Sequence, residues 1–441
     1  MSETVSDSSQ PIQLDENRRR ITLPSGPLQD PWETPLEALD VSDSRLYQQD
    51  AWRPYFERLR RDDPVHFTAD SPFGPYWSIT RHEDIRHVES HHEVFSSFPT
   101  IAIGDSPEGQ YIENFIAMDP PKHEQQRKTV AGVVAPRNLV KLEPVIRGHV
   151  EDILDGLPDG GEAFDWVDRV SIELTTRMLA TLFAFPFEDR RKLTYWSDIS
   201  IGSPETTGMD EGFSAEEVQA GLNDMATTFM GLWAERAAAE PDPNGATDLI
   251  TMLAHGEDTR DMIQRPLEFL GNIMLLIVGG NDTTRNSISG GVMALNQFPE
   301  EYDKLRADAG LIPNMVSEII RWQTPVLHMR RTLKSDYEYA GRQMKAGEKV
   351  VMWYISGNRD EDVHEQADRL IIDRSTARQH ASFGFGIHRC MGNRLAEMQL
   401  RVVWEEIHKR FRFIEVTGPE RRLKSNFIRG IRGLPVRVHR H

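Results

Sequence analysis

Apolar residues recur at three- and four-residue spacing over much of the chain, which is the pattern of helices that bury one face. The spacing predicts helices over 139–157, 167–183, 214–239, 267–298, 313–324 and 392–411. The segment 267–298 is long and apolar, so we expect it to be buried along much of its length. Strand-like segments are short and scattered, at 65–67, 76–79, 348–354 and 434–437. Together these patterns predict a mainly α fold with small β-sheets.

The chain has 441 residues, a length that would suggest about three domains. The candidate linkers, 203–212 and 240–245, are short and lie between predicted helices, so they are better interpreted as surface loops. We therefore expect a single domain over 26–441. The preceding segment, 1–25, has the composition of a flexible tail.

The charge of the chain narrows its possible partners. It carries 51 Lys+Arg against 69 Asp+Glu, a formal net charge of −18, which argues against binding to nucleic acid or to an anionic membrane. No apolar run approaches the roughly 20 residues of a membrane span, and residues 1–10 do not resemble a secretory signal. A single cysteine cannot form an internal disulfide. We expect a cytoplasmic protein with no membrane span.

That cysteine, Cys390, follows a glycine-rich turn and precedes a predicted helix; residues 383–396 read FGFGIHRCMGNRLA. A helix N-terminus favours a thiolate, and the glycines permit a tight turn or a close approach of the backbone. A lone thiolate suits a metal that takes one protein ligand, and haem iron fits this best. The alternative is a buried structural cysteine beside a glycine turn, which is the commoner case for an isolated cysteine.

The pattern F-G-x-G-x-H-x-C-x-G-x-x-L-A is complete in this segment, and it resembles the haem-binding loop of bacterial cytochrome P450 monooxygenases. The resemblance implies the single-domain cytochrome P450 fold, a haem b cofactor and Cys390 as the axial ligand of its iron. The other residues of the loop that would contact the haem or shape the turn are Phe383, Gly384, Gly386, His388 and Gly392.

A second motif, Gly279-Gly280-Asn281-Asp282-Thr283-Thr284, lies inside the long predicted helix. Gly279 and Thr283 share a helix face, and the Thr283 hydroxyl can donate to the Gly279 carbonyl, which bends a helix and opens a groove for dioxygen. The alternative is close helix packing at the glycines beside a solvated Asp–Thr pair. By resemblance to the P450 family, Thr283 and Asp282 are the oxygen-activation pair, with Asp282 relaying protons from solvent.

The same resemblance implies a scaffold around the haem. Glu318 and Arg321 form an E-x-x-R pair, and Arg374 would complete a structural charge cluster, although Ala367 and Leu370 depart mildly from the usual pattern there. The cations for the haem propionates would be His123 and Arg127, in an H-x-x-x-R pattern, together with Arg331 and His388. Arg330 is the alternative if the register is shifted by one residue.

Segments 274–292, 318–332, 350–361 and 382–401 resemble the soluble bacterial terminal hydroxylases of alkanes and fatty acids. This likeness implies oxidation of the terminal C–H bond of medium-chain alkanes by O2, giving primary alcohols. The alternatives are a fatty-acid omega-hydroxylase, a peroxide-dependent haem-thiolate enzyme and, less favoured, a haem sensor without catalysis. The loop 203–212 should cap the substrate channel, and the apolar candidates for its lining are Ile101, Ile103, Val278, Val326, Leu327, Met329 and Phe427.

The chain shows no dinucleotide-binding fingerprint and no further cysteines for an iron–sulfur cluster. We therefore expect separate electron donors, and the resemblance implies a [2Fe-2S] ferredoxin and an FAD-containing NAD(P)H ferredoxin reductase. An acidic ferredoxin would need a basic patch on this acidic protein. The candidates are Arg389, Arg394, Lys128 and Lys409.

Overall fold

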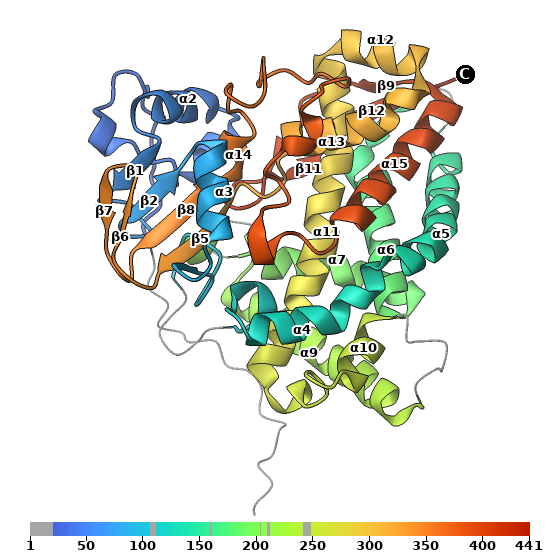
Figure 1. Cartoon of the computed structure of the whole chain (residues 1–441). Coiled ribbons are helices and arrows are strands. Elements are labelled where there is room, and N and C mark those ends of the chain that lie inside the picture. The colour runs from blue at the N-terminus through green and yellow to red at the C-terminus, as the bar shows by residue number, and fades with distance from the viewer. Residues whose placement is uncertain (1–20, 106–111, 159–160, 203, 210–211, 241–247) are drawn as a thin grey trace, which may run out of the picture.

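The computed structural model describes residues 21–105, 112–158, 161–202, 204–209, 212–240 and 248–441. Residues 1–20 of the predicted tail lie outside the described part. Helices form most of the regular structure, and the largest sheet lies to one side of them (Figure 1). The expectation of a mainly α fold with small β-sheets is confirmed.

The six predicted helices are present, with ends that differ from the prediction by no more than a few residues. The segment 167–183 begins with a π-helical turn, Val167–Ile172, which continues into α6. Several shorter helices were not predicted, because their apolar stripes span too few turns. The helices are α1 (Ser44–Gln48), α2 (Arg53–Asp62), α3 (His82–Ser90), α4 (Lys122–Ala131), α5 (Pro136–Asp155), α6 (Glu173–Phe183), α7 (Arg191–Ser200), α8 (Pro204–Thr207), α9 (Ala215–Ala238), α10 (Leu249–His255), α11 (Pro266–Gln297), α12 (Pro299–Ala307), α13 (Ile312–Gln323), α14 (Tyr354–Gly357) and α15 (Asn393–Arg410).

The main sheet has the strand order β1-β2-β8-β5-β3, in which β2 and β8 are parallel and the other pairs antiparallel. A smaller sheet, β4-β12-β9, lies beside the C-terminal end of α15, and two hairpin-like pairs complete the set. The strands are β1 (Val65–Thr68), β2 (Tyr76–Ile79), β3 (Phe95–Ser96), β4 (Phe164–Asp165), β5 (His328–Leu333), β6 (Tyr337–Tyr339), β7 (Arg342–Met344), β8 (Lys349–Trp353), β9 (Phe411–Val416), β10 (Arg421–Arg422), β11 (Ile431–Gly433) and β12 (Pro435–Arg440).

Helix α11 runs through the helical part of the molecule, beside α6, α7, α13 and α15 (Figure 1). It is buried along much of its length, as predicted, but its second half buries polar as well as apolar side chains. Two of them bond to the segment of α6: Asn281 accepts from the Thr175 hydroxyl (2.7 Å), and Ser289 pairs with Ser171 (2.8 Å). These contacts fix the rotation of α11, because each buried polar group needs its partner.

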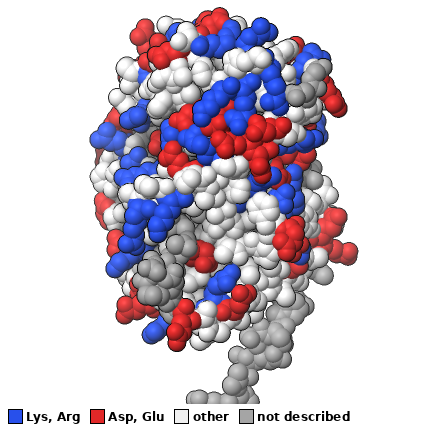
Figure 2. All heavy atoms as spheres, turned by 90° about the vertical axis from the view of Figure 1, so that its right-hand side faces the viewer, with Lys and Arg blue, Asp and Glu red and all other residues white. Residues whose placement is uncertain are grey.

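Basic and acidic side chains lie side by side on the face shown in Figure 2. Helices α5 and α15, at the right of Figure 1, are joined by such pairs: Arg147 with Glu405 (2.6 Å) and Arg401 with Glu143 (2.9 Å). Within the described residues, no helix combines the length and hydropathy that a membrane span requires.

Three buried histidines make the fold sensitive to acid. Burial, as the largest effect, lowers the pKa of His328 to about 3, of His364 to about 2 and of His380 to about 3, from an ordinary value of 6.5. The unfolded chain therefore binds more protons than the folded chain below about pH 6.5, so stability is complete above that pH and falls as the pH decreases toward 3. Each histidine contributes a loss of up to about 1.4 kcal/mol per pH unit.

We expect the midpoint of denaturant unfolding to fall between pH 7 and pH 5, and to fall less in the variant His328→Asn, which keeps a donor for the Asn426 carbonyl (2.8 Å in the parent). His441→Gln, at an exposed position, is the control and should keep the parental pH profile. An identical profile for His328→Asn and the parent would contradict this assignment.

Candidate active site

The cysteine turn is closed by a hydrogen bond from the Cys390 N–H to the Phe383 carbonyl (2.7 Å). Gly384 and Gly386 have φ values of +65° and +62°, a region that strongly favours glycine. The sulfur is accessible through a hollow of about 310 Å³ lined by Arg127, Met391 and Arg394, although protein atoms surround most of it. This burial raises the pKa of the Cys390 thiol, whereas the backbone N–H groups at the start of α15 lower it.

Next to the turn lies a group of basic side chains that lacks enough anionic partners. His123 on α4 and His388 in the turn have ring centroids 4.2 Å apart, and none of their four ring nitrogens has a hydrogen-bond partner among the described residues. Burial first, and then the nearby Arg331 and Arg127, lower the pKa of His123 to about 4 and that of His388 to about 2. Buried, unpartnered donors of this kind fit the carboxylates of haem.

The register of β5 decides which arginine faces this group. Alternate side chains of a strand point to opposite faces. Arg331 lies near His123 and His388 and contacts Glu89 (3.4 Å), whereas Arg330 turns away to bind Asp105 (2.6 Å). The geometry therefore favours Arg331 over Arg330 as the candidate cation for a haem propionate.

On α11, the Thr283 hydroxyl donates to the Gly279 carbonyl (3.0 Å), as the motif predicts. The two glycines of the motif serve different purposes. A Cβ added to Gly279 would meet no atom within 4 Å, so this residue leaves an open space beside Thr283. A Cβ on Gly280 would lie 2.8 Å from Leu179, so Gly280 allows the close packing of α6. Gly280 therefore shows the close helix packing that the alternative interpretation expected. The solvated Asp–Thr pair of that alternative is wrong, because Asp282 is buried. The dioxygen groove stays a prediction.

Asp282 is fully buried and faces α7, so it has no direct exposure to solvent. Its Oδ2 accepts from the Ser197 hydroxyl (2.5 Å), and its Oδ1 pairs with Arg285. Arg285 also binds Asp198 (2.9 Å), which binds Arg432 (2.9 Å). Burial raises the pKa of Asp282, and Arg285 opposes that shift. Protons can reach Asp282 along this hydrogen-bonded network, or directly from solvent if α7 moves. The local sequence around Asp282 does not reveal the network, because Ser197, Asp198 and Arg432 lie on other segments.

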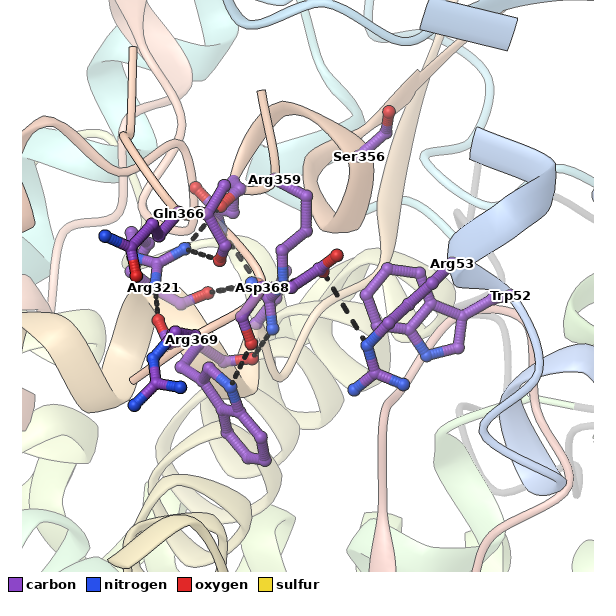
Figure 3. Close-up of polar contacts among 12 residues, drawn as sticks. Trp52, Arg53, Arg321, Ser356, Arg359, Gln366, Asp368 and Arg369 are labelled. Carbon is purple, nitrogen blue, oxygen red and sulfur yellow. Dashed lines mark hydrogen bonds and ion pairs between the residues drawn. The ribbon is translucent and has the colours of Figure 1, made fainter. Parts of the chain in front are cut away.

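The predicted charge cluster around Glu318 assembles. Arg321 binds both carboxylate oxygens of Glu318 (2.7 and 2.8 Å), and Arg374 binds one of them (3.0 Å). Glu318 and Arg321 are completely buried. Arg321 also donates to the carbonyls of Ala367 (2.7 Å) and Arg369 (2.8 Å), which ties α13 to the segment before the cysteine turn (Figure 3).

Neutralising this cluster should strongly destabilise the fold. In Glu318→Gln the side chain keeps its shape, but Arg321 and Arg374 lose the one carboxylate that pairs with them among the described residues. Such a loss typically costs about 3–5 kcal/mol. Denaturant unfolding of the haem-loaded protein measures this loss. The control, Asp303→Asn, removes an exposed partner of Arg306 and should leave the stability nearly unchanged. Equal stability of the two variants would contradict the structural role of Glu318.

The cluster extends beyond the predicted residues to Arg359, which is buried and lies between Trp52 and Trp322 (5.5 and 5.9 Å from their ring centroids). Arg359 shares Asp368 with Arg53 (3.4 and 3.7 Å; Figure 3). Burial and the neighbouring arginines lower the pKa of Arg359 well below its ordinary value. Trp52 and Trp322 lie far from Arg359 in the sequence, so no local pattern could have identified these two contacts.

An apolar cluster contains five of the seven predicted lining residues: Ile101, Val278, Val326, Met329 and Phe427. The prediction missed three other members of the cluster: Ile201, Met209 and Leu423. Met209 belongs to the loop 203–212, of which residues 203, 210 and 211 lie outside the described part. Through Met209, the described part of this loop therefore packs in the apolar cluster.

The other two lining residues were wrongly assigned. Ile103 and Leu327 are fully buried in a different cluster, with Trp353 and Val351 of the main sheet and its neighbours. Leu327 follows Val326 in extended backbone, so its side chain points to the opposite face. Around Ile103 the backbone bends, and the side chains of Ile101 and Ile103 join different clusters.

A groove of about 540 Å³ lies between α13, α15 and the cysteine turn, and Arg378, Arg389 and Arg394 line it. Lys128 is exposed on α4, directly after Arg127, which lines the hollow at Cys390. Lys409 was wrongly included in this patch. It lies at the far end of α15, about 22 Å along the helix axis from Arg394, where it binds Glu406 (2.7 Å).

Comparisons with known proteins agree with this geometry. The sequence profile of the family described as Cytochrome P450 matches residues 234–434. Linalool 8-monooxygenase of Pseudomonas putida is 36% identical over 91% of this chain and 99% of its own. Methyl-branched lipid omega-hydroxylase of Mycobacterium tuberculosis is 32% identical over 91% of this chain and 96% of its own. The structure titled Cytochrome P450-153, from Novosphingobium aromaticivorans, is 46% identical, with a TM-score of 0.83 over 93% of this chain and all of that one.

The chain belongs to the cytochrome P450 family. Its activity is that of a monooxygenase, and its cofactor is haem b held by a thiolate.

Proposed function

We propose that Cys390 binds the haem iron and that the basic group next to the cysteine turn holds the propionates through His123, Arg127, Arg331 and His388. When bound, haem supplies an iron that takes up dioxygen, and a thiolate ligand increases electron donation to it. The protein's own residues then control protons. Thr283 presents a hydroxyl to the open space left by Gly279, and Asp282 connects that helix turn to the network of Ser197 and Arg285.

We propose further that the substrate is a medium-chain alkane, hydroxylated at its terminal methyl group to a primary alcohol. The observation that carries this proposal is the apolar cluster that includes Val278, five residues before Thr283. A terminal C–H bond is stronger than an internal one, so selectivity for it requires walls that admit only the chain end to the oxidant. The relative named for omega-hydroxylation of methyl-branched lipids supports oxidation at a chain end.

A fatty-acid omega-hydroxylase is the second candidate. A fatty acid would need a cation for its carboxylate. Arg330, whose N–H donates to the Ile101 carbonyl (2.8 Å), already binds Asp105 (2.6 Å). This pairing favours the uncharged alkane.

Electrons would come from a [2Fe-2S] ferredoxin reduced by an FAD-containing NAD(P)H ferredoxin reductase. The basic groove of Arg378, Arg389 and Arg394, with Lys128 nearby, offers the ferredoxin a docking surface close to Cys390. Arg378 is included in this proposed docking surface, whereas the predicted Lys409 is not.

The test is product analysis with octane and with dodecanoic acid after reconstitution with ferredoxin and reductase. We expect mainly 1-octanol, and less product from the acid. Phe427→Ala enlarges the apolar cluster and should increase the share of internal alcohols. Leu327→Ala, which opens the other cluster, should not change that share. Mainly internal alcohols from the parent protein would contradict terminal selectivity, and faster turnover with peroxide alone would favour the peroxide-dependent alternative.

A further inference from the structure

Glu89, near the end of α3, is a buried carboxylate with no role in the assignments above. It is 4% exposed, and it lies where α3 meets the cysteine turn. Its two oxygens accept from three donors on three separate elements. The donors are the backbone N–H of Phe385 in the turn (2.6 Å), the phenol of Tyr354 at the start of α14 (2.5 Å) and the guanidinium of Arg331 on β5 (3.4 Å).

The backbone of the turn is shaped around the same residue. A Cβ on Gly386 would lie 2.2 Å from the Glu89 carbonyl oxygen, and a Cβ on Gly384 would lie 3.1 Å from both of its carboxylate oxygens. The two glycines thus allow a close approach of the turn to α3. The close approach of the backbone that the sequence analysis allowed at these glycines is therefore an approach to α3.

Glu89 therefore connects the two ends of the haem site. Through Phe385 it holds the turn that carries Cys390, and through Arg331 it holds a cation that faces His123 and His388. Groups that hydrogen-bond to the direct ligands of a cofactor orient those ligands and tune the cofactor's electronic properties.

We infer that Glu89 is a positioning residue for the haem: it sets the thiolate turn and the propionate cation relative to each other, and its negative charge lowers the reduction potential of the iron. This role is independent of the substrate. Removing the carboxylate should loosen the cysteine turn and Arg331 together, because Glu89 bonds to both.

The experiment compares Glu89→Gln and Glu89→Ala with the parent as haem-loaded proteins. The rate of haem transfer to an excess of an acceptor protein should rise severalfold in Glu89→Gln and on the order of tenfold in Glu89→Ala, in line with the loss of buried hydrogen bonds to a charged group. The midpoint potential should shift to a more positive value in both variants, since a buried negative charge is removed.

Asp84→Asn is the matched control. Asp84 is a half-buried carboxylate on the same helix, and it accepts from the phenol of Tyr339 (2.7 Å), away from the cysteine turn. Its variant should keep the parental transfer rate and potential. If Glu89→Ala does not fold, Glu89→Gln decides the question. A transfer rate and a potential in Glu89→Gln equal to those of Asp84→Asn would overturn the inference.

Discussion

Cys390→Ala should abolish the red-shifted absorption band that the reduced, carbon monoxide-bound protein gives with a thiolate ligand. The expected loss is complete, because Cys390 is the only cysteine in the 441 residues and no other side chain supplies a thiolate. The turn itself should survive, since its closing bond uses the Cys390 N–H and the Phe383 carbonyl, both of which remain. Absorption spectra of the reduced protein with carbon monoxide measure the effect.

Cys390→Ser is the companion variant, with a side chain of similar size that keeps an oxygen in place of the sulfur. It should also lack the thiolate band. An unchanged band in Cys390→Ala would mean that the ligand lies elsewhere, and the assignment of the whole site would fail with it.

Thr283→Ala should separate electron consumption from product formation. The variant loses the hydroxyl that donates to Gly279 (3.0 Å), beside the open space on α11. Positioned proton transfer typically contributes 10²–10⁴-fold to a rate. We therefore expect the alcohol formed per NAD(P)H oxidised to fall by about tenfold or more, with peroxide as the main product of the electrons.

The matched variant, Thr283→Ser, keeps a hydroxyl at the same position and should retain most of the parental coupling. The ratio of product to NAD(P)H, measured beside peroxide release, distinguishes the two variants. Unchanged coupling in Thr283→Ala would contradict the role proposed for this hydroxyl.

Local patterns predicted several contacts of the candidate site that the structure contains, because these contacts are short-range. The cysteine turn spans 383–396, the bond from Thr283 to Gly279 spans one helical turn, and Glu318 and Arg321 are three residues apart on α13. Helical periodicity also located the long helices, because each buries one continuous stripe.

Local patterns could not predict contacts between segments that lie far apart in the sequence. Glu89 and Phe385 are 296 residues apart, and only the packing of α3 on the turn brings them together. The burial of Asp282 depends on Ser197 of α7, 85 residues away. Ile103 and Leu327 lie in a different cluster from the other predicted lining residues for a related reason, since composition does not show which face of an extended segment meets which cluster.

Local patterns in the amino-acid sequence were enough to predict the fold class, to single out the one thiol of the chain and to locate the long helix α11, because spacing along one turn or one helix encodes each of them. The arrangement of the elements in space was needed to show that Arg331, and not Arg330, lies near His123 and His388. It was also needed to show which apolar side chains share a cluster and how Asp282 is enclosed. These depend on register and on packing between elements, and a one-residue shift or a half-turn rotation changes them without changing the local pattern.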